Sequence, residues 1–158
     1  MHADLEVTSA GVGPIVASTR LDRDTIGALL PGYTMGADND EFLLVMDTWP
    51  TGVERWVLRF YPVTGAPETI KQIEIRSPEI TVAGSTWRVD GVFSDLGSVD
   101  TCGCSRGSRT CFRAGEHVAV GIDASCNGDH TPGSVPIDGK KIDKVVWSAT
   151  PLQTADDL

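Results

Sequence analysis

The sequence lacks any long run of apolar residues and has few basic ones. No segment approaches the roughly 20 consecutive apolar residues that cross a bilayer as a helix. Lysine and arginine number 13 against 22 aspartates and glutamates, which gives a formal net charge of −9. An acidic surface repels phosphate backbones. The sequence therefore predicts no transmembrane segment and no nucleic acid among the partners.

The first residues also lack an export signal. The N-terminal sequence Met-His-Ala-Asp-Leu-Glu has neither a basic segment nor an apolar segment, so we expect no signal peptide in this chain. Two interpretations fit that absence: a cytosolic protein, or an exported protein whose signal has been removed. The cysteines must decide between them, because disulfides persist mainly outside the cytoplasm.

The sequence does contain enough apolar residues for one folded domain. The chain has 158 residues, of which 41% are hydrophobic. A chain of this length buries about 68–70% of its unfolded surface. We therefore expect residues 1–158 to form a single domain with its own core.

Short apolar segments separated by turn residues predict a chain made mostly of strands. The predicted strands are residues 5–8, 41–47, 55–61, 70–75, 80–82, 87–89, 117–122 and 142–148. Apolar residues at helical spacing predict a helix over 22–30, with Asp22 as N-cap and Pro31 as the stop. Val92, Phe93 and Leu96 indicate a second helical turn. The predicted fold class is α+β, a largely antiparallel sheet with two short helices.

An internal echo suggests two tandem β/α repeats packed together. Ser18-Thr19, Ile26 and Leu29 recur 67 residues later as Ser85-Thr86, Phe93 and Leu96. The pseudo-repeats would be residues 1–67 and 68–158, each needing the other to bury its sheet face. Chance is the competing explanation, because the matching positions are few.

All four cysteines lie in one polar part of the chain. Cys102, Cys104, Cys111 and Cys126 fall within 25 residues of one another, in a segment rich in glycine and serine. An even number of clustered cysteines in a segment with little apolar content favours disulfides, and hence an oxidising compartment. Four cysteines allow three connectivities, which the sequence leaves open.

Two other uses of the cysteines compete with disulfides. As thiolates they could hold zinc in a cytosolic module, although Cys102-x-Cys104 is the only close pair and structural zinc sites usually have two C-x2–4-C pairs. Cys111 could also be the nucleophile of a small thiol-dependent hydrolase, with His117 as its base. These two readings remain the alternatives to a disulfide-linked domain.

No motif predicts a cofactor or a metal site. Gly11-x-Gly13 lacks the third glycine of a dinucleotide-binding loop. The segment that starts at Asp123 resembles the beginning of a calcium loop, but Ser134 occupies the twelfth position, where a bidentate glutamate is needed. We therefore expect neither a cofactor nor a metal ion.

Four residues are candidates for binding a partner. Arg106, Arg109 and Arg113 form a local positive cluster in an acidic protein, and arginine suits the bidentate capture of carboxylate or phosphate. Neutralising nearby acids such as Glu116 is their competing role. Trp49 is predicted at a hairpin tip, where an exposed indole would anchor a partner.

Three groups of residues resemble a known family. They are Gly11-Val12-Gly13-Pro14-Ile15 with Leu29-Leu30-Pro31-Gly32-Tyr33, then Val89 with Phe93-Ser94-Asp95-Leu96 ahead of a cysteine pair, and Ile142-Asp143-Lys144-Val145-Val146-Trp147-Ser148. In these the chain resembles the YfeY-like bacterial envelope lipoproteins, a family of unknown function. The resemblance covers most of the chain.

That resemblance implies an exported protein of the periplasm or cell envelope. It also implies a disulfide between Cys111 and Cys126, which would bracket a polar hairpin. Cys102 and Cys104 look like additions to the family pattern, and the lipid-bearing N-terminal cysteine is absent from this chain. The hypothesis from the sequence is a non-enzymatic exported domain that binds another envelope protein or a cell-wall component.

Overall fold

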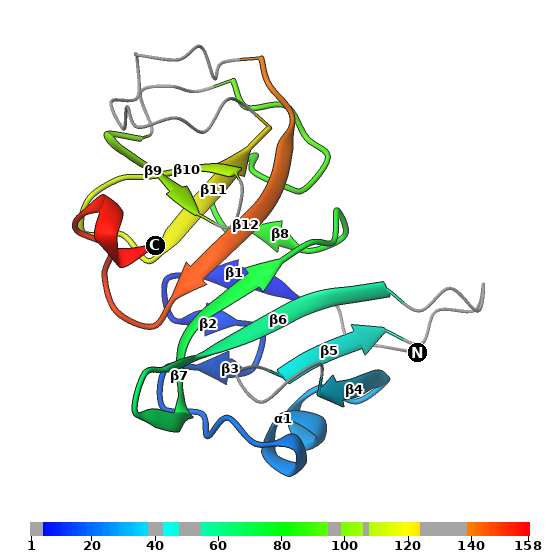
Figure 1. The fold of residues 1–158 in the computed structure, drawn as a ribbon. Helices are drawn as coiled ribbons and strands as arrows, with labels where there is room; N and C mark the ends of the chain where they lie inside the picture. The colour runs from blue at the N-terminus through cyan, green and yellow to red at the C-terminus, as the bar shows by residue number, and fades with distance from the viewer. Residues whose placement is uncertain (1–4, 38–42, 48–54, 95–98, 106–107, 124–138) are drawn as a thin grey trace.

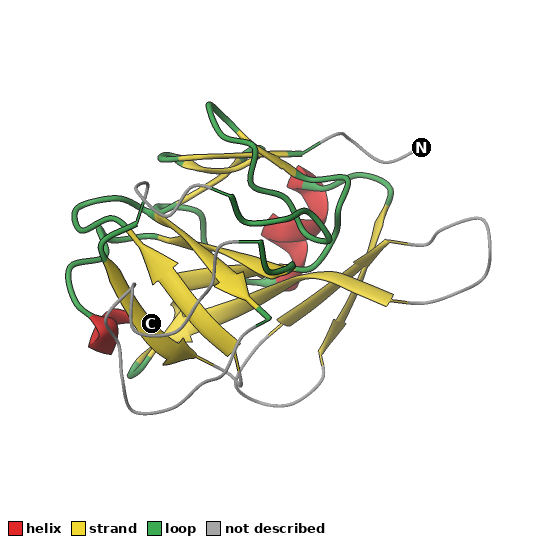
Figure 2. Cartoon of the chain, turned by 90° about the horizontal axis from the view of Figure 1, so that it is seen from above, coloured by secondary structure: helices red, strands yellow, loops and turns green. Residues whose placement is uncertain are grey.

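Two β-sheets stacked over one core make up most of the fold, with a short helix at their side (Figures 1 and 2). The computed structural model describes residues 5–37, 43–47, 55–94, 99–105, 108–123 and 139–158. The elements in chain order are β1 (Glu6–Thr8), β2 (Gly11–Val12), β3 (Ile15–Val16), α1 (Arg23–Leu29), β4 (Tyr33–Ala37), β5 (Leu43–Asp47), β6 (Arg55–Val63), β7 (Ala66–Ile75), β8 (Thr81–Val82), β9 (Thr101–Ser105), β10 (Ser108–Phe112), β11 (Val118–Ile122), β12 (Ile142–Ser148) and the 3-10 helix η2 (Ala155–Asp157).

The larger sheet has eight strands in the order β4-β5-β6-β7-β12-β11-β10-β9, and every neighbouring pair is antiparallel. It consists of two four-stranded meanders that meet where β7 pairs with β12. The smaller sheet has the order β3-β2-β1-β8, and β8 runs parallel to β1. The predicted α+β class with largely antiparallel pairing is therefore confirmed, with strands contributing far more than helices.

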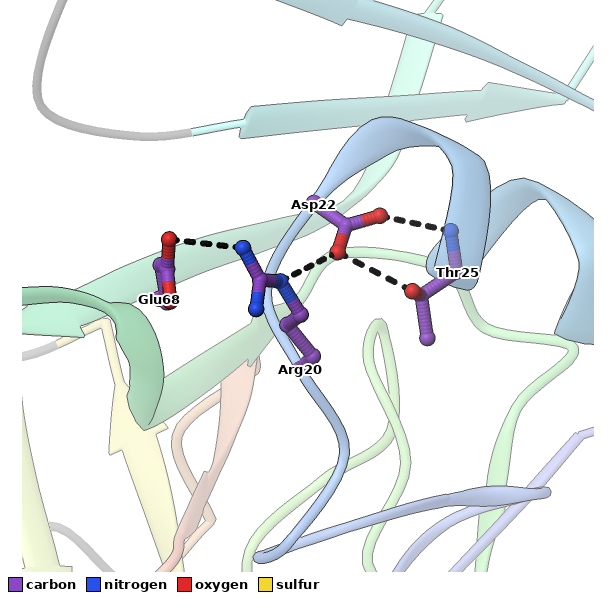
Figure 3. Close-up of polar contacts among 4 residues, drawn as sticks. All are labelled: Arg20, Asp22, Thr25 and Glu68. Atoms are coloured by element: carbon purple, nitrogen blue, oxygen red, sulfur yellow. Dashed lines mark hydrogen bonds and ion pairs between the residues drawn. The ribbon is translucent and has the colours of Figure 1, made fainter.

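The predicted N-terminal helix is present, and its cap explains where it begins. The Asp22 side chain accepts a hydrogen bond of 2.7 Å from the Thr25 N–H and one of 3.0 Å from the Thr25 hydroxyl. Arg20 lies between Asp22 and Glu68 of β7, at 2.8 and 2.7 Å respectively (Figure 3). The cap satisfies an orphan N–H, and the ion pairs tie the start of α1 to the larger sheet.

The predicted second helix is not found. Val92 forms an isolated bridge with Lys141, and the Phe93 N–H donates to the Lys140 carbonyl at 2.8 Å. This extended pairing uses the main-chain groups that a helix would need, and residues 95–98 lie outside the described part of the chain. The predicted strand over 87–89 is also wrong, because that segment has no strand pairing.

The tandem repeat is not confirmed. Of its matched positions, Ile26 and Phe93 are both fully buried in the same core. However, Ile26 lies on α1 and Phe93 lies in an extended segment. Burial of both positions needs no common ancestor or shared unit, because each simply faces the core.

The cysteine segment forms a hairpin, whereas the sequence indicated a cross-linked loop. Cys102 of β9 lies opposite Cys111 of β10, and a disulfide joins them with Cα atoms 4.1 Å apart. The Cys111–Cys126 disulfide implied by the family resemblance is therefore wrong. Cys104 is disulfide-bonded as well, and Cys126 lies outside the described residues.

The larger sheet has two different faces. The smaller sheet and α1 cover the inner face (Figure 2). Its apolar side chains include Phe60, Ile73, Val120 and Trp147. On the outer face, the C-terminal segment with Leu152 and Leu158 packs on Phe112, Ala119 and Val146.

Within the described part of the chain, no helix is long and apolar enough to cross a bilayer.

Candidate functional site

A cleft of about 610 Å³ opens between the smaller sheet and one turn of the larger sheet. One wall is formed by the end of β1 and by residues 82–87, which run from the last residue of β8 into the turn after it. The other wall is formed by the turn between β10 and β11, with Arg113, Glu116, His117 and Val118. The volume lies inside the range of about 300–1,000 Å³ that small-ligand sites occupy, so the cleft is the candidate functional site.

The wall next to β1 is fixed by hydrogen bonds to the core. Buried Trp147 donates its indole N–H to the Ser9 carbonyl at 3.3 Å. The Ala83 N–H donates to the Val7 carbonyl at 2.8 Å, and the Thr8 hydroxyl accepts from the Ala10 N–H at 3.1 Å. These bonds attach the wall to β12 and β1 and hold its main chain in one conformation.

The residues after β8 form a tight turn that exposes hydroxyl groups. The Ser85 N–H donates to the Val82 carbonyl at 3.2 Å, and the Ser85 hydroxyl accepts from the Trp87 N–H at 3.0 Å. Ser85 and Thr86 are exposed and Trp87 is half-buried. A hydroxyl that accepts one bond can still donate its own hydrogen to a ligand.

The opposite wall is tied to the C-terminal segment. The Leu152 N–H donates to the Glu116 carbonyl at 2.8 Å, and the Gly115 N–H donates to the Leu152 carbonyl at 2.7 Å. The Ser148 N–H donates to the His117 carbonyl at 2.7 Å. Gly115 has φ +90°, a conformation that glycine adopts without strain. Main-chain hydrogen bonds to Ser148 and Leu152 therefore hold the turn in place.

The His117 imidazole has one nitrogen committed to the fold. Its Nδ1 lies 2.8 Å from the Ser148 carbonyl oxygen, and since a carbonyl only accepts, Nδ1 carries the proton and donates it. Nε2 is then the nitrogen that remains for a ligand. Among the described residues, no hydrogen bond joins this ring to a hydroxyl of the cleft.

Beside the same turn, the fold already holds a carboxylate. Asp100 accepts from the Ala114 N–H and from the Thr101 hydroxyl, each at 3.0 Å. These two bonds, with the positive charge of Arg113, hold the pKa of Asp100 below its usual value. Arg113, which lines the cleft, thus already stabilises the charged form of the Asp100 carboxylate.

Of the four predicted partner-binding residues, the structure places only Arg113 at the cleft. Arg109 is 1% exposed on β10, whose residues are all buried, so the predicted surface cluster of arginines is wrong for that member. A strand covered on both faces leaves no exposed position for it. Arg106 and Trp49 lie outside the described residues.

The structure also corrects the two alternative uses of the cysteines. Cys111 is bonded to Cys102, so it cannot be the thiolate nucleophile of a Cys111–His117 pair. Cys102, Cys104 and Cys111 are all disulfide-bonded, so they cannot act as the thiolate ligands of zinc. Cys111 lies on the inner face of the sheet, whereas His117 lies on the wall of the cleft.

Sequence reasoning missed most of the cleft. Thr8, Ser9, Ser85 and Trp87 come from two segments of the smaller sheet, and the turn from Arg113 comes from the larger one. No motif connects these segments, since the parallel pairing of β1 with β8 brings them together. The one available signal was the run of small residues at 83–86 (Ala-Gly-Ser-Thr) after a short strand, which is typical of an exposed turn.

The fold, a strand-rich α+β domain with an eight-stranded antiparallel sheet, has a counterpart among solved structures. The chain is similar to the crystal structure of the uncharacterized protein YfeY from Escherichia coli, with a TM-score of 0.65 and 21% identity over 90% of this chain and 99% of that chain. The resemblance seen in the sequence is thereby confirmed for the fold. No protein-family model matches the sequence, and no curated protein matches it either.

Proposed function

We propose that this chain is a non-enzymatic binding domain of the bacterial envelope that holds part of a partner in the cleft between Ser85 and His117. The observation that carries the proposal is the preformed cleft itself. Both of its walls are fixed by hydrogen bonds to the core and to the C-terminal segment, and a rigid site loses little entropy when a ligand binds.

The disulfides support the location. Disulfides are rare in the cytosol and common in exported proteins, and the described cysteines are all oxidised. The envelope assignment itself is what the family resemblance in the sequence implies, and the likeness to YfeY supports the shared fold. A periplasmic location, with or without a lipid anchor, belongs to this proposal.

The chemistry of the cleft favours binding over catalysis. A hydrolase needs a nucleophile activated by a base within hydrogen-bond reach. The cleft hydroxyls of Thr8 and Ser85 accept main-chain hydrogen bonds. His117 uses Nδ1 to bond a carbonyl, where a triad would have a carboxylate. Hydroxyls, an arginine and a half-buried tryptophan are groups that recognise a ligand without reacting with it.

The size of the cleft limits the bound part of the partner. A standard protein–protein interface buries about 800 Å² on each side, whereas this cleft admits a ligand of small-molecule size. The partner would therefore be a cell-wall fragment or an envelope protein that inserts a short segment. This agrees with both partner classes predicted from the sequence.

Amide NMR with two probe sets tests the proposal. We expect either digested cell-wall fragments or short synthetic peptides to shift the amide signals of residues 8–9, 83–87 and 113–118, with the probes unchanged in mass afterwards. If neither set shifts these signals, the cleft is not a binding site. If a probe is cleaved in proportion to protein concentration, the protein is an enzyme and the non-enzymatic assignment fails.

A further inference from the structure

Accessible main-chain donors lie on the wall of the cleft that follows β8. Ala83, Gly84 and Ser85 have small, exposed side chains, so a ligand can reach the main chain there. Among the described residues, the N–H groups of Gly84 and Thr86 make no hydrogen bond. Main-chain N–H groups in a concave turn are the means by which many proteins capture a terminal carboxylate.

The opposite wall adds a single positive charge. Arg113 carries a planar guanidinium with five N–H donors, enough to act on Asp100 and on a ligand at once. Glu116 lies on the same wall, so one carboxylate of the lining offsets the charge of Arg113. Such a lining suits a singly charged carboxylate better than a phosphate monoester, which carries about two negative charges.

An apolar floor lies next to these donors. Val7 and Val82 line the cleft and are 0% and 7% exposed. Trp87 and Val118 are half-buried at the same site, and Trp87 packs on Phe93 with ring centroids 6.3 Å apart. An aliphatic side chain would cover the exposed part of this surface and gain about 25 cal/mol for each Å² of apolar area removed from water.

From the donors, the single guanidinium and the apolar floor, we infer that the cleft binds the free C-terminus of a peptide whose last residue is aliphatic. The terminal carboxylate accepts from the Gly84 and Thr86 N–H groups and from Arg113, and the last side chain packs on Trp87. This inference rests on the proposed function, because it names the ligand of the same cleft. Neither an inorganic anion nor a sugar acid would use the apolar floor.

The test compares two probes that differ only at the carboxylate. The probes are acetyl-Gly-Ala-Leu with a free acid and the same peptide with a C-terminal amide, titrated by calorimetry and by amide NMR. We expect the acid to bind about ten- to a hundredfold more tightly, because charge-assisted hydrogen bonds are lost with the amide. The comparison needs no altered protein, so a failure to fold cannot obscure it.

A matched pair of variants assigns the effect to Arg113. Arg113→Gln should weaken the binding of the acid peptide by about tenfold and leave the affinity of the amide peptide unchanged. Arg23→Gln removes the same charge from an exposed position of α1 and should change neither affinity. If the acid and amide peptides bind with equal affinity and both shift the cleft signals, the cleft binds peptides but does not recognise the terminal carboxylate. If cell-wall fragments shift the amide signals of the cleft and neither peptide does, the inferred peptide ligand is wrong and the proposed binding function stands.

Discussion

The two faces of the larger sheet exclude water in different ways, although they alternate along the same strands. The inner face of β12 presents Val145 and Trp147 to an apolar core. The outer face presents Lys144 and Val146, of which Lys144 is 0% exposed. On the inner side burial needs only close packing, whereas on the outer side each buried polar group needs a partner.

The outer face supplies those partners from the neighbouring strand. Glu74 of β7 is 1% exposed, and its Oε1 lies 3.4 Å from Lys144 Nζ and 3.5 Å from a terminal nitrogen of Arg76. Gly121 of β11 makes room for this group, since a Cβ there would approach Lys144 Cγ to 2.3 Å. A buried charge that keeps its partner costs little net stability, but one that loses its partner is strongly destabilising.

The largest effect should come from the inner face. Phe60→Ala removes a fully buried ring, and we expect a loss of about 3–5 kcal/mol in the free energy of unfolding from lost burial and the cavity left behind. Urea unfolding followed by tryptophan fluorescence measures it. Val92→Ala, at a side chain that is 60% exposed, serves as the control and should change stability by about 0.5 kcal/mol or less.

On the outer face, the number of partners that remain should decide the cost. Lys144→Met removes the ion pair of buried Glu74 with Lys144 and leaves the one with Arg76, and we expect a loss of about 3 kcal/mol. The double variant Glu74→Leu with Lys144→Met removes both charges and should recover most of that loss. If the double variant is as unstable as the sum of its two single changes, the two charges are not coupled and the contrast between the faces is wrong.

The next largest effect should come from the disulfide, which links β9 and β10 through two cysteines buried on the inner face of the sheet. Replacing Cys102 and Cys111 together by alanine should lower the free energy of unfolding by about 2–3 kcal/mol, the loop-entropy value for a short loop. Calorimetry of the variant beside the oxidised protein checks this. A variant as stable as the parent would show that pairing within the β9–β10 hairpin holds the edge of the sheet without the covalent link.

The sequence was informative where a local pattern and the final environment agree. The strands from β5 to β7 and β12 follow from apolar segments bounded by turns, and α1 follows from Asp22 and Pro31, because these signals act within a few residues. Thr64 and Gly65 form the turn between β6 and β7, in the gap between the predicted strands 55–61 and 70–75.

Where long-range pairing decides the structure, the sequence failed. The segment around Cys102 is poor in apolar residues and became strands β9 and β10 only through cross-strand pairing and the disulfide. Val92, Phe93 and Leu96 have helical spacing in the sequence, but pairing of residues 90–93 with residues 139–142 overrides it. The cleft depends on β8 joining β1 in parallel, a contact across nearly half the chain that no local pattern encodes.

The smallest effect is expected at Asp143, next to the charges of the outer face. Burial raises the pKa of Asp143 above its usual value, although Arg76 and Lys144 act to lower it. Its Oδ1 is buried and makes no hydrogen bond with the described residues. Because the folded pKa is the higher one, the folded state binds the extra proton, and stability falls as pH rises through the interval above the unfolded value of about 3.9.

Asp143→Asn should therefore leave stability unchanged or raise it by up to about 1 kcal/mol at pH 7, since the amide carries no charge to desolvate. Below pH 4 the parent carboxyl is protonated in both states, so the advantage of the variant should disappear there. Unfolding in urea at pH 3.5, 5 and 7 measures the trend. A variant less stable than the parent at pH 7 would show that the Asp143 charge is needed by Arg76 and Lys144, and that the outer face uses paired charges throughout.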